Sequence, residues 1–262
     1  MTFENIYVWG KSDHGAVAET PDGWIVMNRS PEGKTTFCPP FLRDPAKLPE
    51  AIEAIFRYCA ENGIVPEVHC LPEAMKPILE QAGYSLLEDR DAFEYLYSAD
   101  DLITLRGKKY NSKRNFLHGF RNEYDYRLKT YTPQKFAEVL DFVKLWAFES
   151  HRISYAEELT AIRAALEDFQ ALRLNCECLY VQDKIVAFSV GFINRNGIGV
   201  VLFEKADTNY RGSYAAINQM FAEKHFQSCE YINRQEDMGL EGLRQAKLSY
   251  HPVRFVKKYL LK

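Results

Sequence analysis

Residues 174–205 read LNCECLYVQDKIVAFSVGFINRNGIGVVLFEK and contain three consecutive predicted β-strands. Residues 174–181 and 184–193 flank a two-residue polar turn, Gln182-Asp183, and the second segment is rich in β-branched and aromatic side chains. This pattern favours an antiparallel hairpin. Residues 197–205 continue the pattern as a third strand. The sequence therefore predicts a β-sheet at the centre of the second half of the chain.

Helix and strand patterns continue on both sides of this sheet. Residues 213–227 place Ile217, Met220, Phe221 and His225 on one face of a predicted helix. Around the hairpin we expect a strand at 126–130, helices at 133–149, 156–172, 213–227 and 239–248, and strands at 230–233 and 253–260.

The first half repeats this order of a hairpin followed by helices. Its hairpin surrounds an Asp22-Gly23 turn, which is a strong hairpin signal. The expected strands are 17–19, 24–28, 35–38, 65–70, 84–87 and 92–97, and the expected helices are 45–62 and 72–82.

Antiparallel hairpins that lead into a β-α-β crossover predict an α/β fold with mixed sheets and helices on both faces. The element order resembles that of the GCN5-related acetyltransferases, here in tandem. We expect an acetyltransferase-like half at residues 1–100, a basic linking helix at 101–124, and a second half at 125–262 that carries the site.

The linker is predicted as one long helix from Thr104 to Glu123. One stripe of this helix begins basic and becomes apolar, and it consists of Lys109, Lys113, Phe116, Phe120 and Tyr124. The apolar end should pack on a sheet, so the basic end should project over the opening between the halves. Four side chains there are candidates for binding phosphate, namely Lys108, Lys109, Lys113 and Arg114. Alternatively, these side chains simply extend into solvent.

Composition bounds the class of protein. The chain has 262 residues, of which 47% are apolar, and a net charge of −3. Residues 102–122 and 242–262 each contain six Lys or Arg and no acidic residue. Such a basic stripe on an acidic body could attract the phosphates of RNA, a nucleotide or lipids. Alternatively, it is an ordinary solvated face. The sequence has no apolar run of about 18 residues and no secretory leader pattern, so we expect a cytoplasmic protein without stable membrane insertion.

The cysteines predict neither a disulfide framework nor a metal site. No Cys-x-x-Cys pair and no His pair at zinc-ligand spacing occurs, so no metal is expected. The six residues are read as reduced thiols, mostly in the core: Cys38, Cys59, Cys70, Cys176, Cys178 and Cys229.

The first candidate site joins the third strand of the second half to the following helix. In acetyltransferases this turn is Gly-rich and binds the pyrophosphate of coenzyme A at the helix N-terminus. Arg211, Gly212 and Ser213 fit such an anion site, whereas Tyr214 crowds the turn where a second glycine is usual. The alternative is a helix start capped by Ser213.

The second candidate site follows the strand at 230–233. Polar residues at the C-terminal end of a buried strand are typical of a site at a sheet opening, and here they include Asn233 and Arg234. Glu236 or Asp237 could accept a proton from an attacking amine or hydroxyl, or could bind an amino group. Alternatively, Asp237 caps the helix expected from Gly239. The sequence does not choose between the two carboxylates.

Further basic residues follow the second site. Lys247, near the end of the short helix, could hold a phosphate or an ester carbonyl, or could complement the helix dipole. Arg254 is a further candidate for substrate binding, and His251 is expected to be structural. The sequence contains no Gly-x-Ser-x-Gly, P-loop or dinucleotide motif, so nucleophilic serine chemistry has no local support.

The stretch from Asn233 to Gly239, together with Gly242-Leu243-Arg244, Lys247 and Tyr250-His251-Pro252, resembles the C-terminal signature of the phosphatidylglycerol lysyltransferase C-terminal domain family. The segments 107–115 and 207–214 also look like that family.

The resemblance implies transfer of an aminoacyl group from aminoacyl-tRNA to a lipid hydroxyl, with the two substrates meeting in a channel between the halves. The acceptor would attack the ester directly, assisted by Glu236 or Asp237, and residues 106–114 would face tRNA phosphates. Lipid-modifying members carry many membrane spans ahead of this domain and this sequence has none, so phosphatidylglycerol as the acceptor does not carry over with the resemblance. The acceptor is expected to be a lipid or another small molecule. The alternatives are an acyl-coenzyme-A-dependent N- or O-acyltransferase and a non-catalytic binding module. No cofactor is implied.

Overall fold

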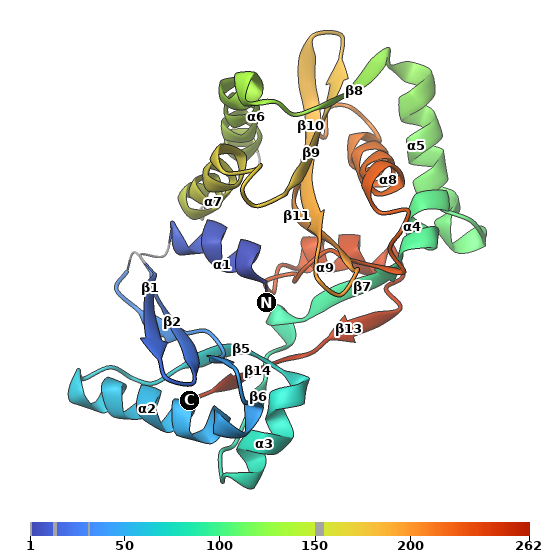
Figure 1. Ribbon diagram of the computed structural model, residues 1–262. Helices are drawn as coiled ribbons and strands as arrows, with labels where there is room; N and C mark the ends of the chain where they lie inside the picture. The colour runs from blue at the N-terminus through green and yellow to red at the C-terminus, as the bar shows by residue number, and fades with distance from the viewer. Residues whose placement is uncertain (1, 13–14, 31, 150–154) are drawn as a thin grey trace.

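A computed structural model describes residues 2–12, 15–30, 32–149 and 155–262. The described residues form two sheets of seven strands each, which lie in two lobes (Figure 1). Both sheets are mixed and are covered by helices, so the α/β fold class predicted from the sequence is confirmed.

The first sheet has the order β1-β2-β3-β5-β14-β6, with β4 paired to β2. Its strands are β1 (Ala16–Thr20), β2 (Gly23–Arg29), β3 (Thr35–Phe37), β4 (Phe41–Leu42), β5 (Val68–Pro72), β6 (Leu87–Glu88) and β14 (Lys258–Leu261). The helices of this lobe are η1 (Pro45–Lys47), α2 (Leu48–Glu61), η2 (Glu73–Met75) and α3 (Lys76–Gln81). The buried face of α2, which confirms the helix expected at 45–62, consists of Leu48, Ile52, Ile55 and Cys59.

The second sheet has the order β13-β7-β12-β11-β10-β9-β8. Its strands are β7 (Glu94–Ser98), β8 (Tyr126–Thr130), β9 (Asn175–Val181), β10 (Lys184–Ile193), β11 (Gly199–Ala206), β12 (Tyr231–Asn233) and β13 (Arg254–Val256). Antiparallel pairing of β9, β10 and β11 confirms the hairpin and third strand from which the fold was predicted.

Helices cover both faces of the second sheet (Figure 1). One face carries η5 (Pro133–Lys135), α6 (Phe136–Glu149) and α7 (Tyr155–Glu167), and the other carries α4 (Ala99–Thr104), η4 (Lys108–Tyr110), α5 (Asn111–Glu123) and α8 (Ser213–His225). Two further short elements, η3 (Arg90–Ala92) and α9 (Glu241–Leu248), flank the end of the sheet at β7 and β12. No helix within the described residues is long and apolar enough to cross a membrane.

The two sheets exchange strands. β7 lies before residue 100 but pairs with β12 and β13 of the second sheet, and β14, at the end of the chain, pairs with β5 and β6 of the first. The single strand expected at 253–260 is therefore two strands in different sheets. The expected boundaries at residues 100 and 125 do not follow the sheets, since each lobe contains a strand from the other part of the chain.

The predicted linking helix over residues 104–123 is interrupted, which corrects that expectation. Leu105 has φ 51° and Gly107 has φ 87°, so the backbone leaves the helical region where α4 ends. The next α-helix, α5, begins only at Asn111. Arg114 holds this break by donating hydrogen bonds to the carbonyl oxygens of Leu105 and Gly107. Lys109 consequently lies in η4 and not on the stripe of α5.

The N-terminal helix α1 (Phe3–Gly10) was not expected from the sequence. The Thr2 hydroxyl caps the helix by accepting a hydrogen bond from the backbone N–H of Asn5. The Tyr7 hydroxyl donates to the Asp168 carboxylate at 2.8 Å. Trp9 packs against Phe203 of β11, with 5.8 Å between ring centroids. The helix therefore belongs to the second lobe, although the chain continues from it into the first sheet (Figure 1).

Candidate active site

The loop after β12 lies where two parallel strands of the second sheet diverge. β11 and β12 pair only at Gly199 with Ile232 and at Val200 with Asn233. Beyond that point the side chain of Gln235 fills the gap.

The Gln235 amide nitrogen donates to the carbonyl oxygens of Val201 at 3.1 Å and Leu202 at 3.3 Å, and its oxygen accepts from Asn5 of α1 at 2.8 Å. The loop is thus built into the sheet.

The same loop is held in an unusual backbone conformation. Gln235 has φ 57° and Met238 has φ 53°, values that cost about 1–3 kcal/mol each for residues other than glycine. Hydrogen bonds to β7 and η3 compensate, because Arg234 N donates to Tyr95 O at 3.0 Å and Met238 N donates to Asp91 O at 3.1 Å. Such a strained and well-anchored loop is typical of a functional site.

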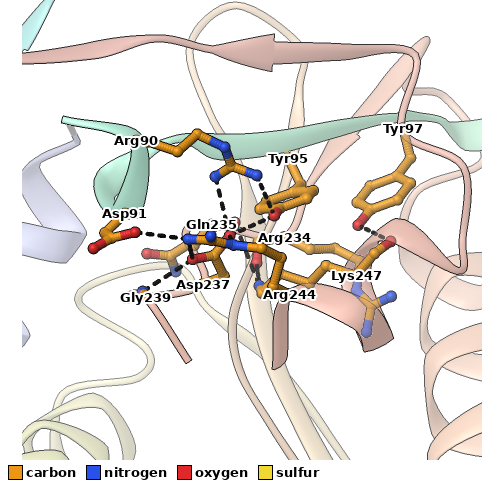
Figure 2. A network of polar contacts seen from close by, with 10 residues as sticks. All are labelled: Arg90, Asp91, Tyr95, Tyr97, Arg234, Gln235, Asp237, Gly239, Arg244 and Lys247. Atoms are coloured by element: carbon orange, nitrogen blue, oxygen red, sulfur yellow. Dashed lines mark hydrogen bonds and ion pairs between the residues drawn. The ribbon is translucent and has the colours of Figure 1, made fainter. Parts of the chain in front are cut away.

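Asp237 lies at the centre of a buried network (Figure 2). Arg244 contacts both carboxylate oxygens, at 2.8 Å from Nη2 and 3.0 Å from Nε. Gly239 N donates at 2.9 Å, Arg90 Nη1 donates at 3.1 Å, and the Tyr95 hydroxyl donates as well. Burial alone would raise the pKa of Asp237, but these hydrogen bonds, led by Arg244, hold it well below its ordinary value. Asp237 is therefore suited to fixing the loop and poorly suited to accepting a proton.

The capping role considered for Asp237 is not observed. The N-cap of α9 is Leu240 and the helix begins at Glu241, not at Gly239. The Asp237 carbonyl oxygen accepts from Leu240 N at 2.9 Å, which forms a turn ahead of the helix.

Glu236 has the opposite environment. Its carboxyl group lines a cavity, and burial raises its pKa, with a further contribution from the carboxylate of Glu94. Within the described part of the chain, no other side chain forms a hydrogen bond or ion pair with it, although Lys247 and Lys258 are near enough to oppose the pKa shift. A carboxylate with a raised pKa and open oxygens is a stronger base than an ordinary glutamate and can accept a proton from a reacting group.

The cavity has a volume of about 280 Å³ and lies between α1, the first sheet and the loop after β12. It is lined by Asn5, Ile6, Trp9, Gly10, Asn28, Cys38, Cys70, Ala92, Glu94, Gln235, Glu236, Met238 and Lys258. On one wall Glu94 accepts from Lys258 at 2.8 Å and from Asn233 at 2.6 Å. Glu236 thus lines a cavity between the two sheets, and Asn233 lies behind its wall through the hydrogen bond to Glu94.

Lys247 of α9 also supports the loop after β12 (Figure 2). Its ammonium group is buried and donates to the carbonyl oxygens of Arg234 and, at 3.3 Å, of Gln235. Burial, with the neighbouring Arg234 charge, lowers the pKa of Lys247 to about 7. The Tyr97 hydroxyl donates to the Lys247 carbonyl at 2.8 Å, so this lysine connects α9, β7 and the loop.

Arg234 forms a second polar cluster on the α8 face of the sheet. Its Nη2 donates to Glu204 at 2.8 Å, and its guanidinium stacks on Tyr250 at 4.7 Å. Glu204 also accepts from Asn218 of α8 at 3.1 Å. The same Tyr250 ring lies 4.1 Å from the Lys113 ammonium, and burial lowers the pKa of Lys113 to about 8.

The turn at residues 211–213 packs one helix on another. A Cβ atom on Gly212, where φ is 91°, would lie 2.3 Å from the carbonyl oxygen of Phe116 in α5. Arg211 stacks on the Phe116 ring at 5.6 Å. The N-cap is Gly212 and not Ser213, whose hydroxyl donates to the Asp207 carbonyl at 2.7 Å, so the capping role considered for Ser213 is wrong.

The remaining basic candidates lie in different surroundings. Lys109 pairs with Asp101 at 2.8 Å, and Arg114 is used within the break before α5. Lys108 is exposed. Arg254 lies on the edge strand β13 and stacks on Tyr231 at 5.8 Å.

Several residues of the site were not identified from the sequence. Arg90, Asp91, Glu94 and Tyr95 come from the first part of the chain, more than a hundred residues from Asp237, and only β7 brings them to the loop. Arg244 was part of the quoted signature and could have been singled out, because an Arg seven residues after Asp237 can reach back from the following helix.

Comparisons with known proteins agree with this fold. The family model described as "Phosphatidylglycerol lysyltransferase, C-terminal" matches residues 1–262. The solved structure of a conserved protein of unknown function from Bacteroides thetaiotaomicron is 33% identical, with a TM-score of 0.88, and the match covers 99% of this chain and 89% of that one. The structure of L-PGS from Bacillus licheniformis is 15% identical, with a TM-score of 0.70 and coverage of 98% and 85%.

Two further similarities concern one curated relative and the fold. An uncharacterized protein of Mycoplasmoides gallisepticum is 31% identical over 171 residues, which are 64% of this chain and 55% of that protein, so the match spans about half of that curated relative. A tandem GCN5-related acetyltransferase of clavulanic acid biosynthesis shares the fold with a TM-score of 0.54, as expected from the element order. Because the family model covers the whole chain, this protein belongs to the phosphatidylglycerol lysyltransferase C-terminal domain family, and its fold is that of the tandem GCN5-related proteins.

Proposed function

We propose that this protein is an aminoacyltransferase that moves an aminoacyl group from aminoacyl-tRNA to the hydroxyl or amino group of a lipid or another small acceptor. Membership in a lysyltransferase domain family supports the reaction class. The observation that carries the proposal is the Glu236 carboxyl group, which faces a cavity between the two sheets without a side-chain partner among the described residues.

The reaction assigned to the cavity is a direct acyl transfer. The acceptor oxygen or nitrogen attacks the ester carbonyl of the donor, and Glu236 takes the proton that the acceptor loses. The bond to the terminal ribose oxygen of the tRNA then breaks, and that oxygen takes a proton as the tRNA leaves. A well-placed proton acceptor contributes about 10²–10⁴-fold to such a step.

Asp237, Lys247 and Gln235 serve this reaction by position. Asp237 fixes the loop through two arginines, Lys247 holds the carbonyl oxygens at 234 and 235, and Gln235 closes the gap beside β11. Together they keep Glu236 at the cavity in a strained loop, which is the arrangement expected of a pre-organised site.

Two contacts weigh against coenzyme A as the donor. The Gly212 turn, where an acetyltransferase would bind pyrophosphate, is covered on one side by the Phe116 backbone of α5. The gap between β11 and β12, which could admit an extended chain, is filled by Gln235. An acyl-coenzyme-A donor would have to displace both.

The test is to incubate the protein with tRNA charged with labelled amino acids and with lipid, peptide and small-molecule fractions of a cell extract. We expect label to move from tRNA into one fraction, and no transfer when acetyl-coenzyme A is the labelled donor. Transfer from the coenzyme alone would contradict the proposal, and so would failure of every fraction to receive label from tRNA.

A further inference from the structure

The charged groups of the cavity restrict the amino acid that it can hold. Among the residues that line it in the described part of the chain, only Glu94, Glu236 and Lys258 carry a formal charge. Each amino acid that enters brings at least one ammonium group, so the number of available carboxylates limits the charge that can be accommodated.

Glu94 is already neutralised. One of its oxygens lies 2.8 Å from the Lys258 ammonium and the other accepts from Asn233 at 2.6 Å. Burial acts to lower the pKa of Lys258, but the Glu94 carboxylate raises it above its ordinary value, so Lys258 stays charged. With only 3% of its surface exposed, Lys258 cannot turn away into water.

Glu236 is therefore the one carboxylate in the described lining that remains available. The α-ammonium group of an aminoacyl donor can use one of its oxygens. A second ammonium, as on a lysyl side chain, would find no unpaired carboxylate and would share a small cavity with the like charge of Lys258. Unpaired charges in such a space are strongly disfavoured.

The rest of the lining suits an uncharged side chain. Trp9 and Ile6 come from α1, Cys38 directly follows β3, and Cys70 lies in β5. At about 280 Å³ the cavity lies just below the range of roughly 300–1,000 Å³ typical of sites for drug-sized ligands. It therefore matches a compact group.

We infer that the cavity takes a compact aminoacyl group with an uncharged side chain, and that the Lys258–Glu94 pair excludes a lysyl group. This inference rests on the proposed function, since it concerns the donor of that reaction. Lys258 comes from the exchanged strand β14 and Glu94 from the exchanged strand β7, so the strand exchange itself builds the selectivity. The family description names lysyl transfer, and this chain departs from it in the donor.

The first test uses the unchanged protein and stable amide analogues of the tRNA end, 3′-(L-alanylamino)-3′-deoxyadenosine and its lysyl counterpart. Calorimetric titration should show the alanyl analogue binding at least tenfold more tightly. Equal or tighter binding of the lysyl analogue would overturn the inference while leaving the proposed function standing. If neither analogue binds, the proposed function fails together with the inference.

The second test changes the pair. Lys258→Gln frees the Glu94 carboxylate, so the ratio of lysyl to alanyl affinity should rise at least tenfold. The double variant Glu94→Gln/Lys258→Gln removes both charges and is the matched control, in which the preference for the alanyl analogue should persist. An unchanged ratio in folded Lys258→Gln would overturn the inference, and the titration of the unchanged protein decides the question if that variant does not fold.

Discussion

Glu236 and Asp237 are adjacent in the chain, but their carboxyl groups lie in opposite electrostatic surroundings. Asp237 accepts hydrogen bonds from Arg244, Arg90, Tyr95 and a backbone amide, which hold its pKa well below the ordinary value against the effect of burial. Glu236 faces a cavity, and burial raises its pKa. One carboxylate thus fixes the loop and the other is available for chemistry, a distinction that the sequence left open.

Replacing Asp237 by Asn should destabilise the protein. Arg244 and Arg90 would lose the buried charge that they share, and breaking a buried ion pair typically costs about 3–5 kcal/mol. Urea unfolding at neutral pH measures the change in the free energy of unfolding. Asp183→Asn is the control, since Asp183 is 97% exposed and should change stability by less than about 0.5 kcal/mol. Equal effects of the two substitutions would rule out the anchoring role.

The same network predicts how stability depends on pH. The pKa of Asp237 is lowered in the folded state, so its stabilisation is present above the unfolded value of about 3.9 and is lost as the pH falls below that value. The unchanged protein should therefore lose stability between about pH 4 and pH 2 more steeply than Asp237→Asn. Parallel curves for the two proteins in this range would contradict the assignment.

The pH dependence of transfer should report Glu236. The transfer rate should fall as the pH is lowered and Glu236 becomes protonated. Because the pKa of Glu236 is raised, this acid limb should lie above about 4.3, the ordinary pKa of glutamate. Glu94→Gln should shift this acid limb to lower pH, since it removes a negative charge and leaves Lys258 unpaired. Profiles of kcat/KM against pH measure both effects. An acid limb that does not move in Glu94→Gln would argue against Glu236 as the titrating group.

Alanine substitutions at two glycines test the packing of α5 against the turn before α8. Gly212 contacts α5, and Gly242 in α9 is the control. Gly212→Ala should destabilise by about 1–3 kcal/mol, because the residue has φ 91° and its Cβ would lie 2.3 Å from the Phe116 carbonyl oxygen. Gly242→Ala meets no atom within 4 Å inside α9 and should stabilise by roughly 0.5–1 kcal/mol. Thermal unfolding of both variants checks the signs, and a stabilised Gly212→Ala would mean that α5 does not cover this turn.

The basic segment before α5 should contribute to tRNA binding through exposed charges. Lys108 is exposed, so Lys108→Gln should weaken tRNA binding and reduce the slope of log K against log salt by about 1. Lys184→Gln, an exposed lysine at the start of β10, is the control and should leave the slope unchanged. Binding measured over a series of salt concentrations separates the two. Identical slopes for both variants would place tRNA elsewhere.

The local parts of this structure could be predicted from the sequence. The β9–β10 hairpin, the buried face of α2 and the polar loop after β12 all follow from patterns within about twenty residues. The prediction of one continuous helix over 104–123 was wrong, because helix propensity alone does not show that Leu105 takes φ 51°. Arg114 stabilises this conformation by a hydrogen bond to the Leu105 carbonyl oxygen. The break depends on contacts that a helical pattern does not contain.

The cavity itself could not have been assembled from the sequence. Glu94 and Lys258 meet because β7 and β14 each join the sheet of the other lobe, and residues 253–260 look like one continuous strand in the sequence. Asn5 reaches Gln235 only because α1 packs on the second lobe. Strand exchange and helix docking are long-range choices that depend on the whole core.

The most direct test of the account compares rates of transfer from charged tRNA for the unchanged protein, Glu236→Gln and Glu241→Gln. Glu241 lies on the exposed surface of α9 and accepts a hydrogen bond from Gln245 at 2.9 Å, so its variant should retain the full rate. Glu236→Gln should lower the rate by about 10²–10⁴-fold without lowering the melting temperature. A Glu236→Gln protein that transfers at the full rate would show that the cavity carboxylate does not perform the chemistry.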